Sequence, residues 1–283
     1  MKFWLLSGII IYYLIINYPL NEEDGCSYIF DLPSRDETFL NPVYFCNADS
    51  GNFYYYSEIT TTVCSDENCK LAILKVFWDL AGNYTRFETL PGKPLTKNDH
   101  IPFTLADYDK LQATLINPTS ILGDKTKDEL LDKDSLKYSE KIDGWTGATN
   151  KEIKAAVVDG ALYSTYTLWH LVNGDVRKEI RKYTESQYNE MMEAQLFNSE
   201  NPRTVLFGLK NLDSSAYPDK FPELLKILER GNPLVNFYIT KRLTPEVFKN
   251  NDNRQAVLNL IESLDNNTQS VIDKLLELTN AGN

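Results

Sequence analysis

The sequence predicts an α+β protein, in which an antiparallel sheet with helices is followed by an all-α tail of repeated helix pairs. Runs rich in β-branched and aromatic residues alternate with polar turns between residues 52 and 88. After residue 150, apolar residues recur at helical spacing, and the Asn-Pro pair at 201–202 returns at 232–233. We therefore expect three parts: an export segment at 1–25, an α+β domain at 26–175 and a helical repeat region at 176–283.

The first 20 residues have the composition of an export segment. Lys2 precedes "FWLLSGIIIYYLIINYPL", which carries no charge, and this pattern is typical of a secretory signal. The run is at the short end of what crosses a bilayer, and the acidic "NEED" after it agrees with Lys2 staying inside. We expect an exported protein, periplasmic or on the outer face of the membrane. Cleavage, lipidation at Cys26 and retention as a membrane anchor all stay open, and a buried strand or helix is the alternative.

The charge balance excludes one class of partner. The 283 residues carry a net charge of −11, with a pI near 4.8. A surface this acidic repels phosphate backbones, so we expect no nucleic-acid partner.

The expected sheet contains a cysteine pair. Residues 26–50 are rich in Pro, Asp and Asn and are predicted to be irregular, whereas three strands are expected between residues 52 and 88. Cys64 and Cys69 flank "SDEN" between the first two strands, so a disulfide that closes this hairpin is the preferred interpretation. A redox pair and a zinc site are weaker alternatives, because the spacing is not C-x-x-C and the chain has only two histidines.

Two helices are predicted in the second half of the α+β domain. Thr104 as N-cap and Asp107 three residues later form a capping box for a helix that ends before "NPTS". "TKDELLD" is expected to form a short helical turn. Residues 150–172 contain no proline and are apolar around much of the helix circumference, which predicts one long buried helix that ends at "NGD".

The tail contains a divergent repeat. Lys210 and Leu212, which follow the first Asn-Pro pair, recur as Lys241 and Leu243 after the second, and a looser third copy spans 264–278. Pairs of short amphipathic helices with a period of thirty-odd residues are typical of an α-solenoid of the HEAT type. An ordinary helical bundle is the alternative.

One short segment, "DGWTGATN" at residues 143–150, has the pattern of a chemical motif. Thr149 precedes the predicted long helix and Glu152 follows three residues later, so a capping box is one interpretation. Gly147 would permit the tight turn before such a cap. A capping box does not account for Asp143, Thr146 and Ala148 in this order.

"DGWTGAT" resembles the flavinylation motif of the FMN-binding domains in periplasmic subunits of Na⁺-pumping NADH:quinone reductase and related ion-translocating ferredoxin:NAD oxidoreductases. That motif is an Asp, two spacers, Ser or Thr, Gly, Ala, and a final Ser or Thr, followed by a helix with an Ala-Val element that "IKAAVV" matches. The resemblance covers roughly 25 residues from Asp143. It implies an FMN whose phosphate is joined to Thr149 by a phosphoester bond, formed by a flavin transferase outside the cytoplasm.

Physical chemistry supports this interpretation of the motif. A phosphate on Thr149 would lie at the start of the predicted helix, where free N–H groups and the dipole favour an anion. Gly147 and Ala148 leave room for a transferase and for the flavin, whereas Glu152 would lie unfavourably near the phosphate. Trp145 is a candidate for stacking on the flavin, with a packing role as the alternative.

The two histidines are weaker candidates. His100 could contact a flavin or a substrate, although a hydrogen-bonded structural role is the more common one. His170 follows Trp169 on the apolar run and is expected to be a core residue.

Two functions follow from these patterns. The first is an exported redox carrier with FMN on Thr149, whose helical tail docks an unknown redox or envelope protein; such a carrier need not be an enzyme with its own substrate. The second is a non-catalytic envelope interaction protein that binds its partner through HEAT-like repeats.

Overall fold

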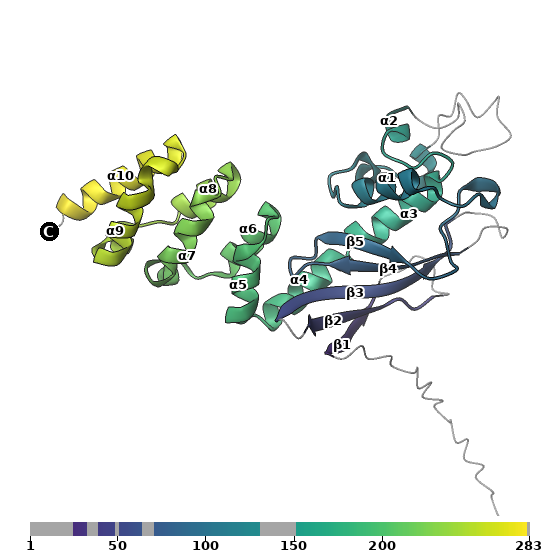
Figure 1. The fold of residues 1–283 in the computed structure, drawn as a ribbon, viewed down its shortest axis with the longest axis horizontal. Helices are drawn as coiled ribbons and strands as arrows, with labels where there is room; N and C mark the ends of the chain where they lie inside the picture. Colours follow the sequence, from purple (N-terminus) through teal and green to yellow (C-terminus); the bar gives the residue numbers. More distant parts are fainter. Residues whose placement is uncertain (1–24, 33–38, 49–50, 64–70, 131–150, 282–283) are drawn as a thin grey trace, which may run out of the picture.

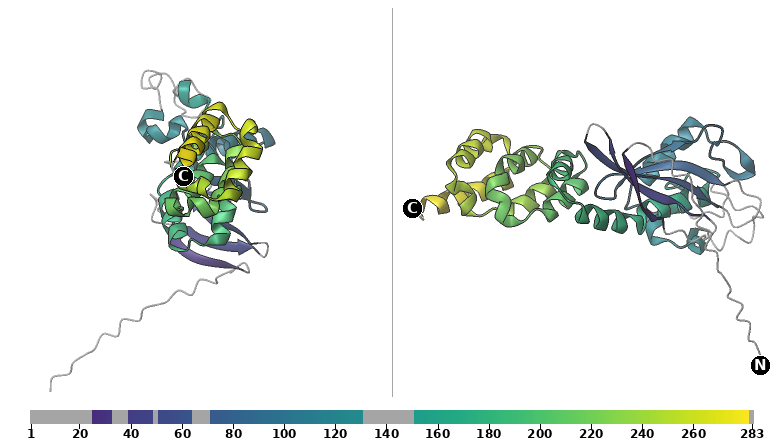
Figure 2. Two further views of the ribbon diagram at one scale, coloured as in Figure 1. Left: turned by 90° about the vertical axis from the view of Figure 1, so that its left-hand side faces the viewer. Right: turned by 90° about the horizontal axis from the view of Figure 1, so that it is seen from below.

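The computed structural model describes residues 25–32, 39–48, 51–63, 71–130 and 151–281. It is elongated, with a β-sheet and its covering helices at one end and an array of helix pairs that extends to the C-terminus at the other (Figures 1 and 2). The α+β class is confirmed.

The sheet has five antiparallel strands in the order β1-β2-β3-β4-β5. The three strands expected between residues 52 and 88 are present. The expectation that residues 26–50 are irregular is wrong, because the first two strands form there. The strands are β1 Cys26–Asp31, β2 Pro42–Ala48, β3 Asn52–Thr61, β4 Ala72–Trp78 and β5 Tyr84–Thr89.

Tertiary pairing holds β1 and β2 in the sheet. Six consecutive residues of β2 pair with β3, and Cys26 of β1 lies opposite Cys46 of β2. These two cysteines form a disulfide across the two strands. The Pro, Asp and Asn residues of this region are typical of turns, but pairing with neighbouring strands makes the region part of the sheet.

The Cys26–Cys46 disulfide should contribute measurably to stability. The two cysteines are 20 residues apart in sequence. In the chain-entropy model a loop of this size stabilises the fold by about 3 kcal/mol. The double variant Cys26→Ala, Cys46→Ala should lose about that much free energy of unfolding in urea denaturation under oxidising conditions. Cys64 and Cys69 are present in both proteins, so equal unfolding midpoints would show that the link stabilises little.

Alternation along the strands gives the sheet two different faces. The inner face packs against α1, α3 and α4 and contains Tyr55, Leu74 and Trp78, all with no exposed surface. The Trp78 indole N–H donates to the carbonyl oxygen of Val172 in α3 at 2.9 Å. The outer face carries a separate aromatic cluster in which the Tyr44 and Tyr56 rings stack at 5.1 Å.

The expected capping box at Thr104 is confirmed. It begins α1 Leu105–Leu115: the Asp107 N–H donates to Thr104 Oγ1, and the Thr104 N–H donates to Asp107 Oδ2. The expected turn in "TKDELLD" is the 3-10 helix η3 Lys127–Leu130. Two further 3-10 helices flank α1 in the sequence, namely η1 Asn98–His100 and η2 Ile121–Asp124.

The expected single helix over residues 150–172 is wrong. The chain instead forms a one-turn helix, α2 Lys151–Lys154, and a buried helix, α3 Leu162–Asn173. Gly160 lies between them at φ +75°, a conformation that a helix does not contain. The buried character of the second part is as expected, and α3 ends before Gly174.

The remaining helices begin with α4 Val176–Ser186, which contributes to the core under the sheet, and continue as a row of short helices (Figure 1). Asn201 and Asn232 each cap a helix whose first residue is proline, so the repeated Asn-Pro pair marks equivalent helix starts. The elements are α5 Glu190–Asn198, α6 Pro202–Asn211, η5 Ser214–Ala216, α7 Tyr217–Glu229, α8 Pro233–Thr240, η6 Pro245–Lys249, α9 Asn251–Leu260, η7 Ile261–Ser263 and α10 Asn266–Ala281.

Two hydrophobic cores meet at α5 and α6. The core under the sheet continues past residue 175 through Ile180 of α4 to Leu196 and Phe207, and the second core begins at Phe197 and runs to Leu276. Within the described ranges, none of the helices combines the length and the apolar character needed to cross a membrane.

Candidate functional site

The residues expected to carry FMN lie outside the described part of the chain. They are Asp143, Trp145, Thr146, Gly147, Ala148 and Thr149, and the same applies to Cys64 and Cys69. The structure does describe the segment that follows the motif directly: α2, the turn after it and the start of α3.

The helix after the motif ends after one turn, and its buried face continues into the segment that follows. Ile153 in α2 and Val157 and Val158 in the following turn are all fully buried. The chain turns twice: the Ala156 N–H donates to the Ile153 carbonyl oxygen and the Ala161 N–H donates to the Val158 carbonyl oxygen. One helical turn has few aligned peptide dipoles. Helix α2 alone would therefore stabilise a phosphate at its N-terminus less than the expected long helix would.

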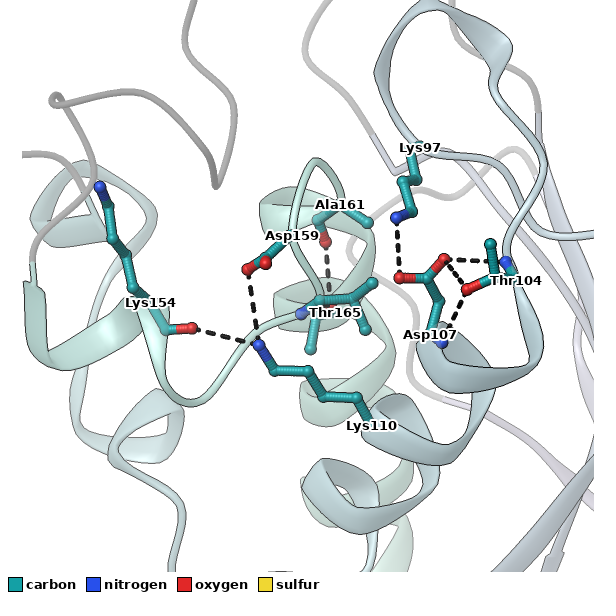
Figure 3. Close-up of polar contacts among 9 residues, drawn as sticks. Lys97, Thr104, Asp107, Lys110, Lys154, Asp159, Ala161 and Thr165 are labelled. Carbon is teal, nitrogen blue, oxygen red and sulfur yellow. Dashed lines mark hydrogen bonds and ion pairs between the residues drawn. The ribbon is translucent and has the colours of Figure 1, made fainter.

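Side chains of α1 hold this turn in place (Figure 3). The Lys110 ammonium lies 3.5 Å from the Lys154 carbonyl oxygen and 3.5 Å from Asp159 Oδ1. The Thr114 hydroxyl donates to the Ala156 carbonyl oxygen at 3.1 Å. The carbonyl groups that the helix break releases therefore have partners on α1.

A threonine of α3 forms hydrogen bonds with backbone groups of the turn between α2 and α3. The Thr165 hydroxyl accepts from the Val158 N–H at 3.2 Å and donates to the Ala161 carbonyl oxygen at 2.9 Å (Figure 3). Thr165 is fully buried, so both bonds are shielded from water.

The loop at residues 95–104 packs on the same turn. The Asn98 N–H donates to the Gly160 carbonyl oxygen at 2.8 Å. Lys97 forms an ion pair with Asp107 at 2.7 Å. Burial opposes ionisation of Asp107, but the bonds from Lys97 and Thr104 outweigh it and lower the pKa of this carboxyl group.

The two histidines have different surroundings. His100 lies on this loop with an exposed side chain and a φ of +60°. His170 is half-buried in α3, where a ring nitrogen lies 3.0 Å from the Leu122 carbonyl oxygen and the ring centroid lies 4.3 Å from that of Tyr166. The surroundings of His170 are those of a packed structural residue.

A solvent-open cavity of about 370 Å³ lies next to the end of α2, where Ala155 and Ala156 line it. Small side chains form part of its wall, and several hydroxyl, amide and ammonium groups face it. Its lining includes Lys110, Ala113, Thr114, Asn117, Ser120 and Ala155.

A second polar cluster, at the turn between β4 and β5, has no counterpart among the residues singled out in the sequence. Asp79 Oδ1 accepts from the Ala81 N–H at 2.9 Å and the Asn83 N–H at 2.8 Å. Asp79 Oδ2 accepts from the Asn83 amide at 3.1 Å and from the Thr204 hydroxyl of α6. This carboxylate therefore links the sheet to α6. We call this contact between the β4–β5 turn and α6 the Asp79 joint.

Two arginines of α4 also donate hydrogen bonds to the β4–β5 turn at the Asp79 joint. Arg177 donates to Asn83 Oδ1 at 3.2 Å, and Arg181 Nε donates to the Ala81 carbonyl oxygen at 2.8 Å. Burial, together with the positive charges of Arg181 and Arg203, lowers the pKa of the Arg177 guanidinium, and Asp79 partly offsets this. The residues of the β4–β5 turn therefore have partners about a hundred positions away in the sequence.

The joint has a further tie between α5 and β3. Gln195 Oε1 accepts from the Phe53 N–H at 2.8 Å, and Gln195 Nε2 donates to the Phe53 carbonyl oxygen at 2.7 Å. A cavity of about 410 Å³ lies at this joint, with Asp79, Asn83 and Arg203 in its wall.

The described residues include no group of three or more His, Cys, Asp or Glu side chains placed to hold a metal ion. Comparisons with family models, curated proteins and solved structures give no match for this chain. Function therefore has to be inferred from the chain's own residues.

Proposed function

We propose that this protein is an exported flavoprotein that carries FMN covalently on Thr149 and transfers electrons. The observation that carries the proposal is "DGWTGAT" at residues 143–149, which ends two residues before α2 and its adjacent cavity. FMN, when bound, supplies one- and two-electron chemistry.

The described residues fit such a group in two respects. The cavity of about 370 Å³ beside α2 is within the size range of sites that hold cofactors and small ligands. The Lys154 ammonium points away from Lys110 and Asp159, on the α2 turn that follows the motif (Figure 3). A cation there would offset phosphate charge that a one-turn helix stabilises only weakly.

Each of the chain's own groups has a separate task in this proposal. Lys110 and Thr114 hold the α2–α3 turn to α1 and so fix the described segment that follows the motif in sequence. The polar groups of the cavity wall, Asn117 and Ser120 among them, would orient the flavin. A covalent link keeps the cofactor outside the cytoplasm, where free FMN is scarce.

Export is supported by two features. The uncharged run after Lys2 is typical of a signal segment. The disulfide between Cys26 and Cys46 is typical of oxidising compartments. The proposed location is the periplasm or the outer face of the membrane, with the N-terminal segment as an anchor if it is retained.

Thr149→Ala should abolish covalent flavin, because it removes the oxygen that forms the phosphoester bond. Thr149→Ser should retain some, since its hydroxyl remains. Each variant is co-expressed with a flavin transferase, precipitated with acid, and measured by flavin absorbance in the washed pellet. Thr146→Ala is the matched control, and it should still yield flavin-bearing protein. Equal flavin in wild type and Thr149→Ala would contradict the proposal.

A second function, an envelope interaction scaffold, is favoured by the helix pairs of the tail. In the array from α5 to α10, α6 and α8 begin with the same asparagine cap and proline, and the helices share a continuous core. We propose that this array is HEAT-like and that it binds an envelope or redox partner, since stacked helix pairs expose extended surfaces.

A further inference from the structure

Acidic residues are missing from two helices of the tail. Residues 201–212 and 231–245, which include α6 and α8, contain no Asp or Glu. At the chain's average of 40 acidic residues in 283, these windows together would hold about four. The preceding helices of each pair do carry acids: Glu190 and Glu193 on α5, and Asp219, Glu223 and Glu229 on α7.

The two acid-free helices carry similar residues at two of three equivalent positions, an apolar side chain followed by a lysine. Both begin with proline after an asparagine cap, so equal distances from the proline are equivalent positions. The even-numbered helices lie along one side of the array and the odd-numbered ones along the other (Figure 1). Positions one, four and eight after the proline define a basic–apolar face: Arg203, Leu206 and Lys210 on α6, and Leu234 and Phe237 on α8 with Lys241 at its C-cap.

This face is open to solvent. Leu234 is 61% exposed and Phe237 is 58% exposed, and the cations of the face are also exposed. The Lys241 ammonium lies over the Phe237 ring, 4.9 Å from its centroid. Within the described helical region, the ion pairs do not involve Arg203, Lys210 or Lys241. The face therefore combines uncompensated positive charge with exposed apolar surface.

We infer that the basic–apolar face docks an acidic segment of a partner protein, one in which apolar side chains accompany the carboxylates. The carboxylates would pair with the cations, and the apolar side chains would cover Phe237 and Leu234. Neighbouring helices are separated by about 8–10 Å, which matches a segment that crosses from α6 to α8. Docking at this face does not depend on FMN at Thr149.

An anionic membrane is a less suitable occupant of this face. The cations are confined to two short helices, and the chain as a whole has a net charge of −11. A broad anionic surface would repel the rest of the molecule, whereas a narrow segment meets the acid-free helices alone.

The test uses the full chain and a fluorescein-labelled peptide of 16 residues in which Glu alternates with Leu and Phe. Fluorescence anisotropy should show binding that weakens as salt is added. Lys210→Glu combined with Lys241→Glu should reduce affinity at least about tenfold, because attraction becomes repulsion at both positions. Phe237→Ser should also reduce affinity, and Leu105→Ser, which changes an exposed leucine of α1, should not.

The matched control is Lys182→Glu combined with Lys226→Glu, on α4 and α7. It changes the net charge equally and removes two exposed lysines outside the face. Equal weakening by both double variants would show a bulk charge effect and overturn the inference. So would absence of peptide binding by the wild type. Binding to phosphatidylglycerol vesicles in place of the peptide would assign the face to a membrane and overturn it as well.

Discussion

Replacing Asp79 with Ala is expected to lower the free energy of unfolding by about 3 kcal/mol. The change removes a carboxylate that accepts two backbone N–H groups, the Asn83 amide and the Thr204 hydroxyl. Asn83 and Thr204 are buried, so the donors to Asp79 lose an acceptor without gaining full access to water, although the Asn83 amide still donates to the Thr204 hydroxyl. The β4–β5 turn and α6 should both loosen.

Urea denaturation measures the loss, and hydrogen exchange locates it. Protection should fall in the β4–β5 turn and at the start of α6, while α10 should keep its protection. Thr204→Val is the matched variant, because it removes one donor to Asp79, and with it one acceptor of the Asn83 amide, and leaves the other three donors to Asp79. It should cost about 1 kcal/mol. A loss for Asp79→Ala no larger than that for Thr204→Val would show that the carboxylate does not organise this joint.

Gly82→Ala is expected to destabilise the protein by about 3 kcal/mol or more. Gly82 has a φ of +70°, which an alanine tolerates poorly. An added Cβ would also lie 2.8 Å from the Arg177 carbonyl oxygen and 3.0 Å from its Cα. Backbone atoms cannot rotate away, so α4 would have to shift from the sheet.

Gly92→Ala separates the two causes. Gly92 has a φ of +73°, but a Cβ there would meet nothing within 4 Å. Its cost should be the conformational strain alone, about 1 kcal/mol. Thermal or urea unfolding of both variants gives the comparison. If the two substitutions cost the same, close packing of Gly82 on Arg177 does not contribute to stability.

Local signals in the sequence were sufficient for several elements. The capping box of Thr104 and Asp107 predicted the start of α1, because both partners lie within one helical turn. The aromatic and β-branched runs predicted β3, β4 and β5 for a similar reason. The Asn-Pro pairs marked the starts of α6 and α8, since a cap and a proline act on the helix that they begin.

Other elements depend on partners that are distant in sequence. Turn-forming residues flank β1 and β2. These segments are strands because β1 pairs with β2 and β2 pairs with β3. The Asp79 joint connects residues 125 positions apart, so no local pattern could indicate it.

At the break between α2 and α3, the hydrophobic pattern wrongly predicted one continuous helix. Ile153 and Val157 are buried in the real turn, as they would be in a continuous helix, so burial could not distinguish the two. Gly160 was the local sign of a break. Its consequence depends on Thr165 and on α1, which supply the hydrogen bonds that the turn needs.

Covalent attachment of FMN to Thr149 is tested most directly by peptide-resolved mass spectrometry. The full chain is co-expressed with an active flavin transferase in a host that exports it, and its peptides are mapped. We expect the peptide that contains Thr149 to carry the mass of FMN less one water, with fragment ions that place it on Thr149 and not on Thr146. An unmodified Thr149 in wild-type protein, under conditions where the transferase modifies a known acceptor, would contradict this account.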